Sequence, residues 1–535
     1  MFVRFLLTLA TIASLTTVAR GAPAIYVTRS QIPTTTISSE VQSFITAGYA
    51  SVFDGGEGCE WTRATVSAPG AVQSADGAYW ALSRTSAIDI KCVGGLASSS
   101  DVYPALVAAS QIARAPNPGI DSFGQILISN KYPYLTLATP GLTTYNGEGI
   151  NGCAAGTAVI NTTFTSGTAI TTTGGGVNLD CLALIGATGN HATGFQLGVG
   201  ASDQAGQQRV VRDTTVRGFE RGIYSASGAG WQFSNVVVDN FTTVGVEIDN
   251  PTCDAGDWFI NGLVVGGPDG ATYPTSKGVK WDCSGGGKIT GLKIFYGAYG
   301  WYSAPTAGTV DMQFAANSIE GQSVAGMYFV SNGGSLGHVT IASSEFGGLP
   351  EGIVLVSGVA AVTFVGNTCA NIGIACIRIE DGVGRVVVGS NDYDPNSVPI
   401  IDNRVNALSM WGHLDRDYDR PVAFSSDSVW TDLASYTIPM NGYSTKLTLF
   451  FEGQLSGSGF VTRDMTMILK NTGSGVSVYF DRDITTTTGG IFDLNIRTSG
   501  NTMTVEVRRQ SGVGTNFFGT MTQHVEGPLQ SYRFL

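Results

Sequence analysis

The sequence predicts an all-β protein built around a right-handed parallel β-helix, a solenoid of stacked coils, with an N-terminal cap helix and a C-terminal β-sandwich. Glycine accounts for 72 of the 535 residues, about 13% and roughly twice the usual ~7%. Charged residues make up 13% of the chain, about half of the usual ~25%. Because the chain is also 43% hydrophobic and 10% aromatic, it can bury a large core, which excludes wholesale disorder. A sequence phrase that recurs through the middle of the chain selects the solenoid among all-β folds.

Residues 1–24 predict a secretory signal peptide. Arg4 supplies a positive charge, residues 5–19 are mostly apolar, and Ala22-Pro23-Ala24 is an A-x-A cleavage site. The alternative is an N-terminal arm that docks on a partner. Residues 25–95 form a head segment, and no later segment has the run of about 18 apolar residues that a membrane-spanning helix needs.

A cap helix is predicted over residues 102–114, near the start of a solenoid that we expect to extend over residues 96–404. Ser100 or Asp101 can accept hydrogen bonds from the first turn, and Pro104 lies in that turn, where its missing N–H costs little. The exposed end of a β-solenoid needs a cap, and this helix is placed to provide it.

Residues 180–395 repeat a phrase in which a glycine is followed by a short apolar strand. Intervals that average about 26 residues indicate a solenoid, since a four-stranded propeller blade needs about 40 and leucine-rich repeats need Leu at fixed offsets. One coil of a parallel β-helix fits, with variable turns that absorb insertions. The anchoring glycines are Gly194, Gly222, Gly245, Gly278, Gly300, Gly326, Gly352 and Gly373.

The repeat stops near residue 400. Residues 405–421 are predicted to be a linker, because residues 415–421 form the densest charge cluster of the chain. Residues 422–535 contain five segments of alternating apolar and polar residues, separated by Gly, Thr and Ser turns. This spacing is typical of a β-sandwich.

Charge and cysteine content restrict the class of partner. The net charge of −12, from 29 Lys and Arg against 41 Asp and Glu, argues against nucleic acid, since phosphate binding needs a basic patch. The eight Cys permit disulfides in an exported chain. Cys369 and Cys376 fit either a local disulfide or two buried thiols. Because no C-x2-C spacing exists and the four His lie far apart in the sequence, we expect no metal site and no cofactor.

The head segment contains several distinctive words. They are Ile-Pro-Thr-Thr-Thr-Ile at 32–37, Ala-Gly-Tyr-Ala-Ser at 47–51, Asp-Gly-Gly-Glu-Gly at 54–58, Gln-Ser-Ala-Asp-Gly-Ala-Tyr-Trp at 73–80 and Ile-Asp-Ile-Lys at 88–91. This segment resembles the N-terminal part of tailspike-like β-helix proteins of phages and prophages of α-proteobacteria. The resemblance covers residues 25–140 by sequence words and residues 140–400 as an architecture only.

The resemblance implies a pectate-lyase-like β-helix whose C-terminal part resembles the trimerising or sugar-binding ends of such spikes. It also implies a homotrimer, association with a phage tail or baseplate, and bacterial surface polysaccharide as the ligand. In place of the Gly-Asp-Gly-x-x-Asp-Asp run of such proteins, residues 94–101 read Gly-Gly-Leu-Ala-Ser-Ser-Ser-Asp. A spike assembled in the host cytoplasm would carry no signal peptide, so we expect an extracellular protein that is either secreted or, if residues 1–24 are a docking arm, part of a virion tail.

The anchoring glycines also predict which side chains meet, because equivalent positions of successive coils lie ~4.8 Å apart. We place the residue after each glycine inward. The next residues then form a solvent-facing ladder of Tyr224, Glu247, Lys280, Tyr302 and Tyr328. A neighbouring ladder places Asp249 above Asp282.

These ladders have the ingredients of a sugar site. The three tyrosines are the predicted sugar platforms, because aromatic faces stack on pyranose rings. Lys280 is expected to neutralise a carboxylate or to bind an acidic sugar. Crowded carboxylates push one pKa up, and their separation distinguishes retention (about 5–5.5 Å) from inversion (about 6.5–9.5 Å). The predicted acid, base or nucleophile are Glu247, Asp249 and Asp282. The alternative for the charged residues is ordinary ion pairing on a solenoid surface.

Three functions remain open from the sequence. The first is a tailspike-like depolymerase that cleaves bacterial surface polysaccharide as a glycoside hydrolase or a lyase. The second is a receptor-binding or adhesive β-helix without catalysis. The third is a secreted structural solenoid, which the aligned tyrosines make less favourable than the other two.

Overall fold

The structure is a computed structural model. It describes residues 27–83, 87–115, 124–129, 134–145, 147–174, 176–187, 191–199, 209–225, 230–249, 258–389, 391–394, 397–403, 415–424, 431–438, 444–455, 459–471, 475–487, 492–509, 517–526 and 531–534. The predicted signal peptide at 1–24 lies outside the described residues. The chain divides into two units, Met1–Phe164 with Gly176–Ile185 and Thr165–Gly175 with Gly186–Leu535.

Unit 1 begins with a short 3-10 helix, η1 (Arg29–Thr34), and a small antiparallel sheet in the order β1-β2-β4-β3. The strands are β1 (Ser43–Ile45), β2 (Glu60–Ala64), β3 (Val72–Gln73) and β4 (Tyr79–Leu82). Trp61 and Trp80 are buried in this sheet, and the Arg63 guanidinium lies 4.6 Å from the centre of the Trp80 ring. A disulfide joins Cys59 to Cys92 in η2 (Ile90–Val93). The head segment is therefore a folded body with its own core.

The predicted cap helix is α2 (Tyr103–Arg114). The Asp101 carboxylate accepts a 3.0 Å hydrogen bond from the Tyr103 N–H, so Asp101 satisfies part of the first turn. The first parallel strand, β5 (Ala87–Asp89), precedes the helix and pairs with β6 (Gln125–Leu127). Parallel pairing therefore starts before residue 96, where the sequence placed the solenoid. A three-residue strand is too short to show the repeated phrase.

The rest of unit 1 is built from short parallel strands in two ladders, β5-β6-β9-β12 and β7-β10-β13. A second disulfide joins Cys153 to Cys181. The remaining elements of this unit are β7 (Tyr134–Leu137), β8 (Leu142–Thr144), β9 (Gly149–Asn151), η3 (Cys153–Ala155), β10 (Ala158–Thr162), β12 (Asn178–Asp180) and β13 (Leu182–Ile185).

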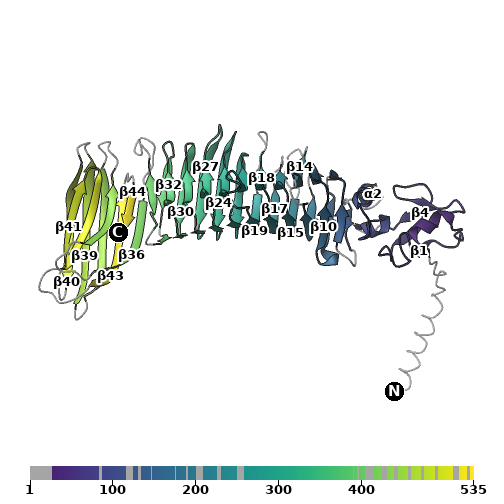
Figure 1. Cartoon of the computed structure of the whole chain (residues 1–535), viewed down its shortest axis with the longest axis horizontal. Helices are drawn as coiled ribbons and strands as arrows, with labels where there is room; N and C mark the ends of the chain where they lie inside the picture. Colours follow the sequence, from purple (N-terminus) through teal and green to yellow (C-terminus); the bar gives the residue numbers. More distant parts are fainter. Residues whose placement is uncertain are drawn as a thin grey trace, which may run out of the picture. The chain divides into compact units, whose positions relative to one another are not determined.

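Unit 2 contains the regular part of the solenoid, which Figure 1 shows as successive parallel arrows between β14 and β32. One of its parallel sheets, here the glycine sheet, carries the predicted repeat. Its strands are β11 (Thr168–Thr173), β14 (Thr193–Val199), β16 (Arg221–Ser225), β18 (Val244–Ile248), β20 (Lys277–Trp281), β23 (Tyr299–Ser303), β26 (Ala325–Phe329), β29 (Glu351–Leu355), β32 (Ala375–Ile379) and β35 (Ile400–Asp402).

The remaining strands of the solenoid form a second surface, here the bent sheet. In its first coils one nine-residue strand bends in the middle, and in later coils two shorter strands replace it. The strands are β15 (Arg209–Arg217), β17 (Trp231–Asp239), β19 (Trp258–Gly266), β21 (Gly285–Thr290), β22 (Lys293–Phe295), β24 (Thr309–Ala315), β25 (Ser318–Glu320), β27 (Ser335–Ala342), β28 (Glu345–Gly347), β30 (Val359–Val365), β31 (Thr368–Ala370), β33 (Arg385–Val388) and β34 (Asp392–Tyr393).

The repeated glycines are required because successive coils approach each other closely. A Cβ atom on Gly278 would lie 2.7 Å from the carbonyl oxygen of Gly300, and one on Gly300 would lie 2.5 Å from that of Gly326. Contacts of this kind repeat along the column that runs from Gly194 to Gly352. The residues after these glycines, such as Val279 and Trp301, are fully buried. The recurring phrase therefore encodes a column of side-chain-free contacts beside an apolar core.

A polar ladder fixes the bend of the later coils. Asn317, Ser344 and Asn367 are buried, and each follows a residue with positive φ, namely Ala316, Ser343 and Gly366. The Asn317 side chain accepts a 2.9 Å hydrogen bond from the Leu292 N–H, and the Asn367 side chain accepts a 2.8 Å bond from the Ser344 N–H. Backbone groups that the bend frees from strand pairing are thus satisfied inside the solenoid.

One predicted anchor is wrong. The pairing of Ile353 with Ile377 places Cys376, not Gly373, opposite Gly352. Ile374 is therefore 49% exposed and Ile377 1% exposed, the reverse of the expected pattern. Gly373 instead lies before β32. There it resembles an anchoring glycine but stands three residues before the position that pairs with Gly352. The disulfide between Cys369 and Cys376 confirms the local-disulfide alternative and lies in this coil.

The C-terminal part consists of antiparallel strands in two groups, β36-β43-β38-β39-β40 and β41-β42-β37-β44. The second group continues the glycine sheet, because β44 pairs with β35. Its elements are β36 (Asp415–Phe424), β37 (Thr431–Thr437), β38 (Ser444–Leu455), β39 (Gly459–Asn471), β40 (Val476–Thr487), β41 (Phe492–Ser499), β42 (Thr502–Arg509), β43 (Phe517–Glu526) and β44 (Ser531–Phe534).

The predicted linker is only partly described, and its described part is not a linker. Residues 415–421 belong to β36, which pairs with β43 along its whole length. Charge density misled the sequence prediction, because antiparallel pairing depends on the partner strand more than on composition. Within the described ranges, no helix combines the length and apolar character needed to cross a membrane.

Candidate functional site

The strand register brings the predicted ladder together. On the glycine sheet, Tyr224 pairs with Glu247, Glu247 with Lys280, Lys280 with Tyr302, and Tyr302 with Tyr328. These five residues, on β16, β18, β20, β23 and β26, are called the ladder surface below. Because Ile248 pairs with Trp281, the residues that follow them, Asp249 and Asp282, also lie beside each other. The pairing that placed these side chains in one row was thus predictable from the glycine anchors.

Lys280 lies at the centre of three carboxylates. Its Nζ is 2.8 Å from an oxygen of Asp249, 2.8 Å from one of Asp282 and 3.0 Å from one of Glu247. Burial alone would lower the pKa of Lys280, but hydrogen bonds to the three carboxylates outweigh it and raise the pKa above its ordinary value. Lys280 is therefore an ammonium ion throughout the physiological pH range.

The carboxylates differ in exposure, and Glu247 and Asp282, which were both expected to face solvent, are buried. Glu247 was expected to face solvent but is 5% exposed, because the long side chains of Arg221 and Lys280 cover it. Arg221 Nε lies 2.6 Å from Glu247 Oε2. The Asp282 side chain is also largely covered, at 10% exposure, whereas that of Asp249 is 35% exposed. Burial raises the pKa of Asp282, although hydrogen bonding and the charge of Lys280 act against this shift.

The tyrosines form a compact aromatic group next to these charges. The rings of Tyr302 and Tyr328 are stacked, with centroids 5.4 Å apart and planes 3° from parallel. Tyr299 packs edge-on against both rings, at 5.3 and 5.5 Å. Burial raises the pKa of Tyr302 and of Tyr328, so both phenols remain neutral at physiological pH. Tyr224 lies apart from this group, with the Arg221 guanidinium 4.5 Å from its ring centre.

Three neighbouring residues were missed by the sequence interpretation. Arg221 covers Glu247, Tyr299 completes the aromatic group, and the Lys277 ammonium lies 4.8 Å from the centre of the Tyr302 ring. Each directly precedes an anchoring glycine. In these strands the residue before the glycine and the residue two after it are both half-buried, while the glycine and the residue between them are buried, a pattern that simple alternation does not predict. The position before the glycine is thus the signal that would have found them.

A second charged cluster follows the tyrosines along the same sheet. Val354 pairs with both Tyr328 and Arg378, so the row continues over two more coils. Arg378 Nε lies 2.6 Å from an oxygen of Glu351, and Nη1 lies 2.7 Å from an oxygen of Glu380. The aromatic group is therefore flanked by ion-paired clusters on both sides.

The site shows no metal-binding arrangement. Among the described residues, no group of three or more His, Cys, Asp or Glu side chains is placed to hold a metal ion. The groups that this surface presents are carboxylates, an ammonium group and aromatic rings.

Comparison with known proteins identifies the fold. No protein-family model matches the sequence, and no curated protein matches it. Full-length tailspike protein 2 from an Escherichia coli O157:H7 bacteriophage is similar in structure, with 10% identity over 95% of this chain and 82% of the tailspike, and a TM-score of 0.50. The enzymatically active domain of tailspike protein 2 of bacteriophage CBA120 is 12% identical over 97% of this chain and 94% of that domain, with a TM-score of 0.52. The chain thus has a tailspike-like parallel β-solenoid fold, as the resemblance implied.

Proposed function

We propose that this protein is a tailspike-like glycan-binding depolymerase that hydrolyses bacterial surface polysaccharide at the ladder surface. The observation that carries the proposal is the stacked pair of Tyr302 and Tyr328, which continues in register into Lys280 and its carboxylates. The structurally similar domain from bacteriophage CBA120 is described as enzymatically active, and this supports a catalytic role on the same fold.

The aromatic rings supply binding to pyranose faces. Successive coils repeat every ~4.8 Å, a spacing close to the length of one pyranose residue in an extended polysaccharide. Because Tyr302 and Tyr328 stack on each other, the pair offers its outer ring faces, ring edges and hydroxyl groups to consecutive sugars. Lys277 lies over the Tyr302 ring, and its ammonium donates a 3.3 Å hydrogen bond to the Thr275 carbonyl. We propose that Lys277 binds an acidic substituent on the sugar, the role that the sequence analysis predicted for Lys280.

Asp282 and Asp249 are the proposed catalytic pair. Asp282, with its raised pKa, is the proposed general acid that gives its proton to the glycosidic oxygen. The more exposed Asp249 is the proposed nucleophile at the anomeric carbon, and water then hydrolyses the glycosyl ester. Because each carboxylate has an oxygen 2.8 Å from the Lys280 ammonium, those two oxygens are at most twice that distance apart. Such a spacing favours retention, at about 5–5.5 Å, over inversion, at about 6.5–9.5 Å.

The remaining residues of the ladder take supporting roles in this proposal. Glu247, which is held by Arg221 and Lys280, is a positioning residue rather than a reacting group. β-Elimination needs a base near neutral pH. The raised pKa of Lys280 and of Tyr224 keeps both residues protonated near neutral pH, so neither is available as that base.

Receptor binding without catalysis is the second candidate. The observation that favours it is that Glu247, Asp249 and Asp282 all lie in ion pairs with Lys280, and structural ion pairing alone accounts for such contacts. In this case the tyrosines bind the glycan and the carboxylates only shape the surface.

Size-exclusion chromatography of capsular and O-antigen polysaccharides, before and after incubation with the protein, tests the proposal. We expect wild-type protein to shorten one polymer and Asp249→Asn or Asp282→Asn to reduce the rate by about 10²–10⁴-fold, while the polymer still co-elutes with protein. Asp239→Asn is the matched control, because Asp239 is ion-paired with Arg217 on the bent sheet. If both ladder variants shorten the polymer at the wild-type rate, these carboxylates are excluded from catalysis. Co-elution without shortening by the wild type would favour the receptor-binding function.

The proposal has three further parts. The protein takes bacterial surface polysaccharide as its partner and works outside the cell, and the tailspike identity of the similar structures supports these two parts. The third part, a homotrimer, rests on the resemblance of the head segment to tailspike-like proteins.

A further inference from the structure

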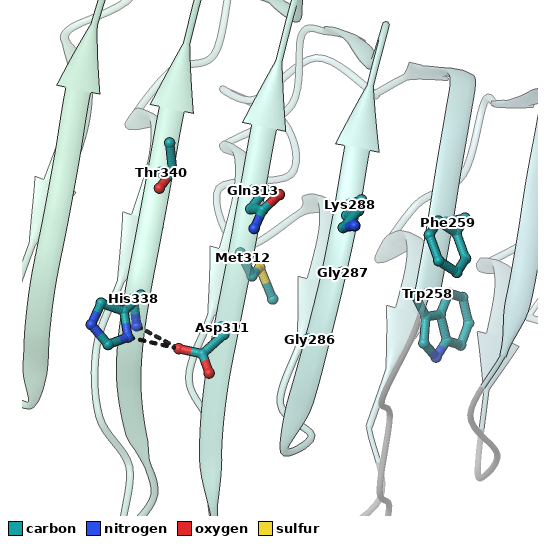
Figure 2. Close-up of a pocket in the computed structure, with 10 residues that line it drawn as sticks. All are labelled: Trp258, Phe259, Gly286, Gly287, Lys288, Asp311, Met312, Gln313, His338 and Thr340. Carbon is teal, nitrogen blue, oxygen red and sulfur yellow. Dashed lines mark hydrogen bonds and ion pairs between the residues drawn. The ribbon is translucent and has the colours of Figure 1, made fainter. Parts of the chain in front are cut away.

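A depression of about 210 Å³ lies on the bent sheet, away from the ladder surface. It spans four successive coils on β19, β21, β24 and β27 (Figure 2). The buried side chains of Trp258 and Met312 line it from the core side. Nothing in the predicted site or in the proposed hydrolysis uses these residues.

Two glycines of β21 line the depression. Gly286 and Gly287 occupy the middle of the depression, where neighbouring coils carry larger side chains. The alternation of β21 turns Gly286 outward, between Lys288 on the same strand and Asp311 on the next coil. A Cβ atom on Gly286 would lie 2.6 Å from the Asp311 carbonyl oxygen. The two coils therefore approach each other closely at Gly286, and neither Gly286 nor Gly287 places a side chain in the depression.

An aromatic ring borders the depression. Phe259 is 45% exposed, so part of its ring is open to a ligand. The Lys288 ammonium lies 5.9 Å from the centre of this ring. In Figure 2 the side chains of Phe259, Lys288, Gln313 and Thr340 follow one another across the four strands, as their pairing requires.

A polar pair forms the opposite border. The His338 backbone N–H donates a 2.6 Å hydrogen bond to Asp311 Oδ1, and His338 Nδ1 lies 3.3 Å from the same oxygen. This contact orients the imidazole, so that Nε2 remains available to a ligand. The His338 side chain is 82% exposed and that of Asp311 62%. Together with the Gln313 amide and the Thr340 hydroxyl, they present both donors and acceptors on one face.

We propose that this depression is a second glycan-binding site, selective for an uncharged hexopyranose. A sugar ring stacked on Phe259 would direct its hydroxyl groups, which both donate and accept hydrogen bonds, towards Gln313, Thr340 and the Asp311–His338 pair. The charges of Lys288 and Asp311 cancel, which disfavours phosphate and other anions. The rim is too polar for a purely apolar ligand. The site retains a neutral segment of polysaccharide and does not depend on cleavage at the ladder surface.

Saturation-transfer NMR on the full chain tests this proposal, with methyl glycosides of glucose, galactose and mannose as separate millimolar probes. The double variant Tyr302→Ala with Tyr328→Ala removes the platform of the ladder surface. We expect at least one probe still to bind this variant, and Phe259→Ala added to it to weaken that binding about tenfold. Gln313→Ala is expected to weaken it less. Phe480→Ala is the matched control, because Phe480 is 55% exposed on β40.

The outcomes separate the two surfaces. If the double tyrosine variant shows no saturation transfer at all while its circular dichroism matches the wild type, the second site is overturned. The proposal of glycan binding at the ladder surface would not be affected by that result. Unchanged binding after Phe259→Ala would also overturn it, as would equal weakening by Phe480→Ala. Phe259→Ala in the wild-type background serves as a check that does not depend on the tyrosine variant, and there we expect the number of binding sites to fall from two to one.

Discussion

Lys280 holds together three carboxylates that would otherwise repel one another. Two of them, Glu247 and Asp282, are 5% and 7% exposed, so solvent cannot screen their charges effectively. A buried cation with several carboxylate partners stabilises a fold chiefly by preventing uncompensated charge. Lys277 is a natural comparison, because it lies on the same strand directly before Gly278 and, among the described residues, forms no ion pair with a carboxylate.

We therefore expect Lys280→Met to destabilise the protein by on the order of 3 kcal/mol, because removal of one partner leaves buried carboxylates unneutralised. Lys277→Met should cost about 1 kcal/mol or less, since it loses mainly a cation–π contact. Urea denaturation followed by tryptophan fluorescence measures both. Equal midpoints for the two variants would mean that the carboxylates do not depend on Lys280.

A second residue-scale prediction concerns Glu148 in unit 1. Its side chain is buried, and burial raises its pKa although the Tyr145 N–H and the charge of Arg114 act against the shift. A carboxyl whose folded pKa lies above its unfolded pKa stabilises the fold below the unfolded pKa and loses that contribution as pH rises through the folded pKa. Glu148→Gln keeps an acceptor without the charge.

Glu148→Gln should therefore raise the denaturation midpoint of the protein at pH 8 and change it little at pH 4. Thermal scans of both proteins at the two pH values provide the measurement. A variant that is less stable than the wild type at pH 8 would contradict the expected cost of the buried carboxylate.

At the scale of single residues, the sequence predicted the members of the ladder but not their environment. Strand period and glycine spacing place Glu247 opposite Lys280, and the structure has this pairing. Exposure depends on which long side chains fold over a neighbour, so the cover that Arg221 gives to Glu247 was not predictable. The depression on the bent sheet was missed for a similar reason. Gly286, Asp311 and His338 meet only after coils stack, and the one local signal is the Gly285-Gly286-Gly287 run.

At the scale of the element, the glycine column defines the glycine sheet. Its glycines do not need positive φ; they are required because a side chain would strike the backbone of the next coil. A Cβ on Gly278 would lie 2.7 Å from the Gly300 carbonyl oxygen and 2.8 Å from Ile294 Cγ2. By contrast, a Cβ on Gly347 in β28 would meet only Glu320 Cγ, at 3.5 Å. A side chain would therefore clash at Gly278 but not at Gly347, so only the first position requires glycine for steric reasons.

We expect Gly278→Ala to destabilise the protein by about 1–3 kcal/mol, the usual cost of overpacking. Gly347→Ala should be neutral or stabilising by up to about 1 kcal/mol, because it reduces the entropy of the unfolded chain without a clash. Denaturant midpoints for the two variants and the wild type decide this comparison. If Gly278→Ala is tolerated as well as Gly347→Ala, the coils can separate without cost and the repeated glycine has another cause.

The same reasoning explains where element prediction failed. Gly373 lies in the repeated phrase but not in the column, because the register of β32 puts Cys376 opposite Gly352. Spacing alone cannot distinguish a glycine in the column from one in the preceding turn when the interval between coils varies. The charged run at 415–421 was likewise interpreted from composition, whereas its strand is defined by pairing with β43.

At the scale of the whole molecule, covalent cross-links occur in both units. Cys59–Cys92 and Cys153–Cys181 lie in unit 1, and Cys369–Cys376 lies in unit 2. Their sequence separations are 33, 28 and 7 residues. In the chain-entropy model, loops of the first two lengths stabilise by about 3–4 kcal/mol each and the third by about 2 kcal/mol. Such cross-links form in an oxidising compartment and are rare where thiols are kept reduced.

This chemistry distinguishes export from assembly in a host cytoplasm. We expect protein isolated from its natural source to show no alkylation of these six cysteines in denaturant until a reductant is added, as peptide mass spectrometry would show. Reduction should also lower the denaturation midpoint, most strongly through the two longer loops. Alkylation of Cys59 and Cys92 without reductant would mean that the chain folds with free thiols, which would favour the virion tail over the secreted protein. Complete protection would instead show that the chain has met an oxidising environment, because burial alone cannot protect thiols once denaturant has exposed them.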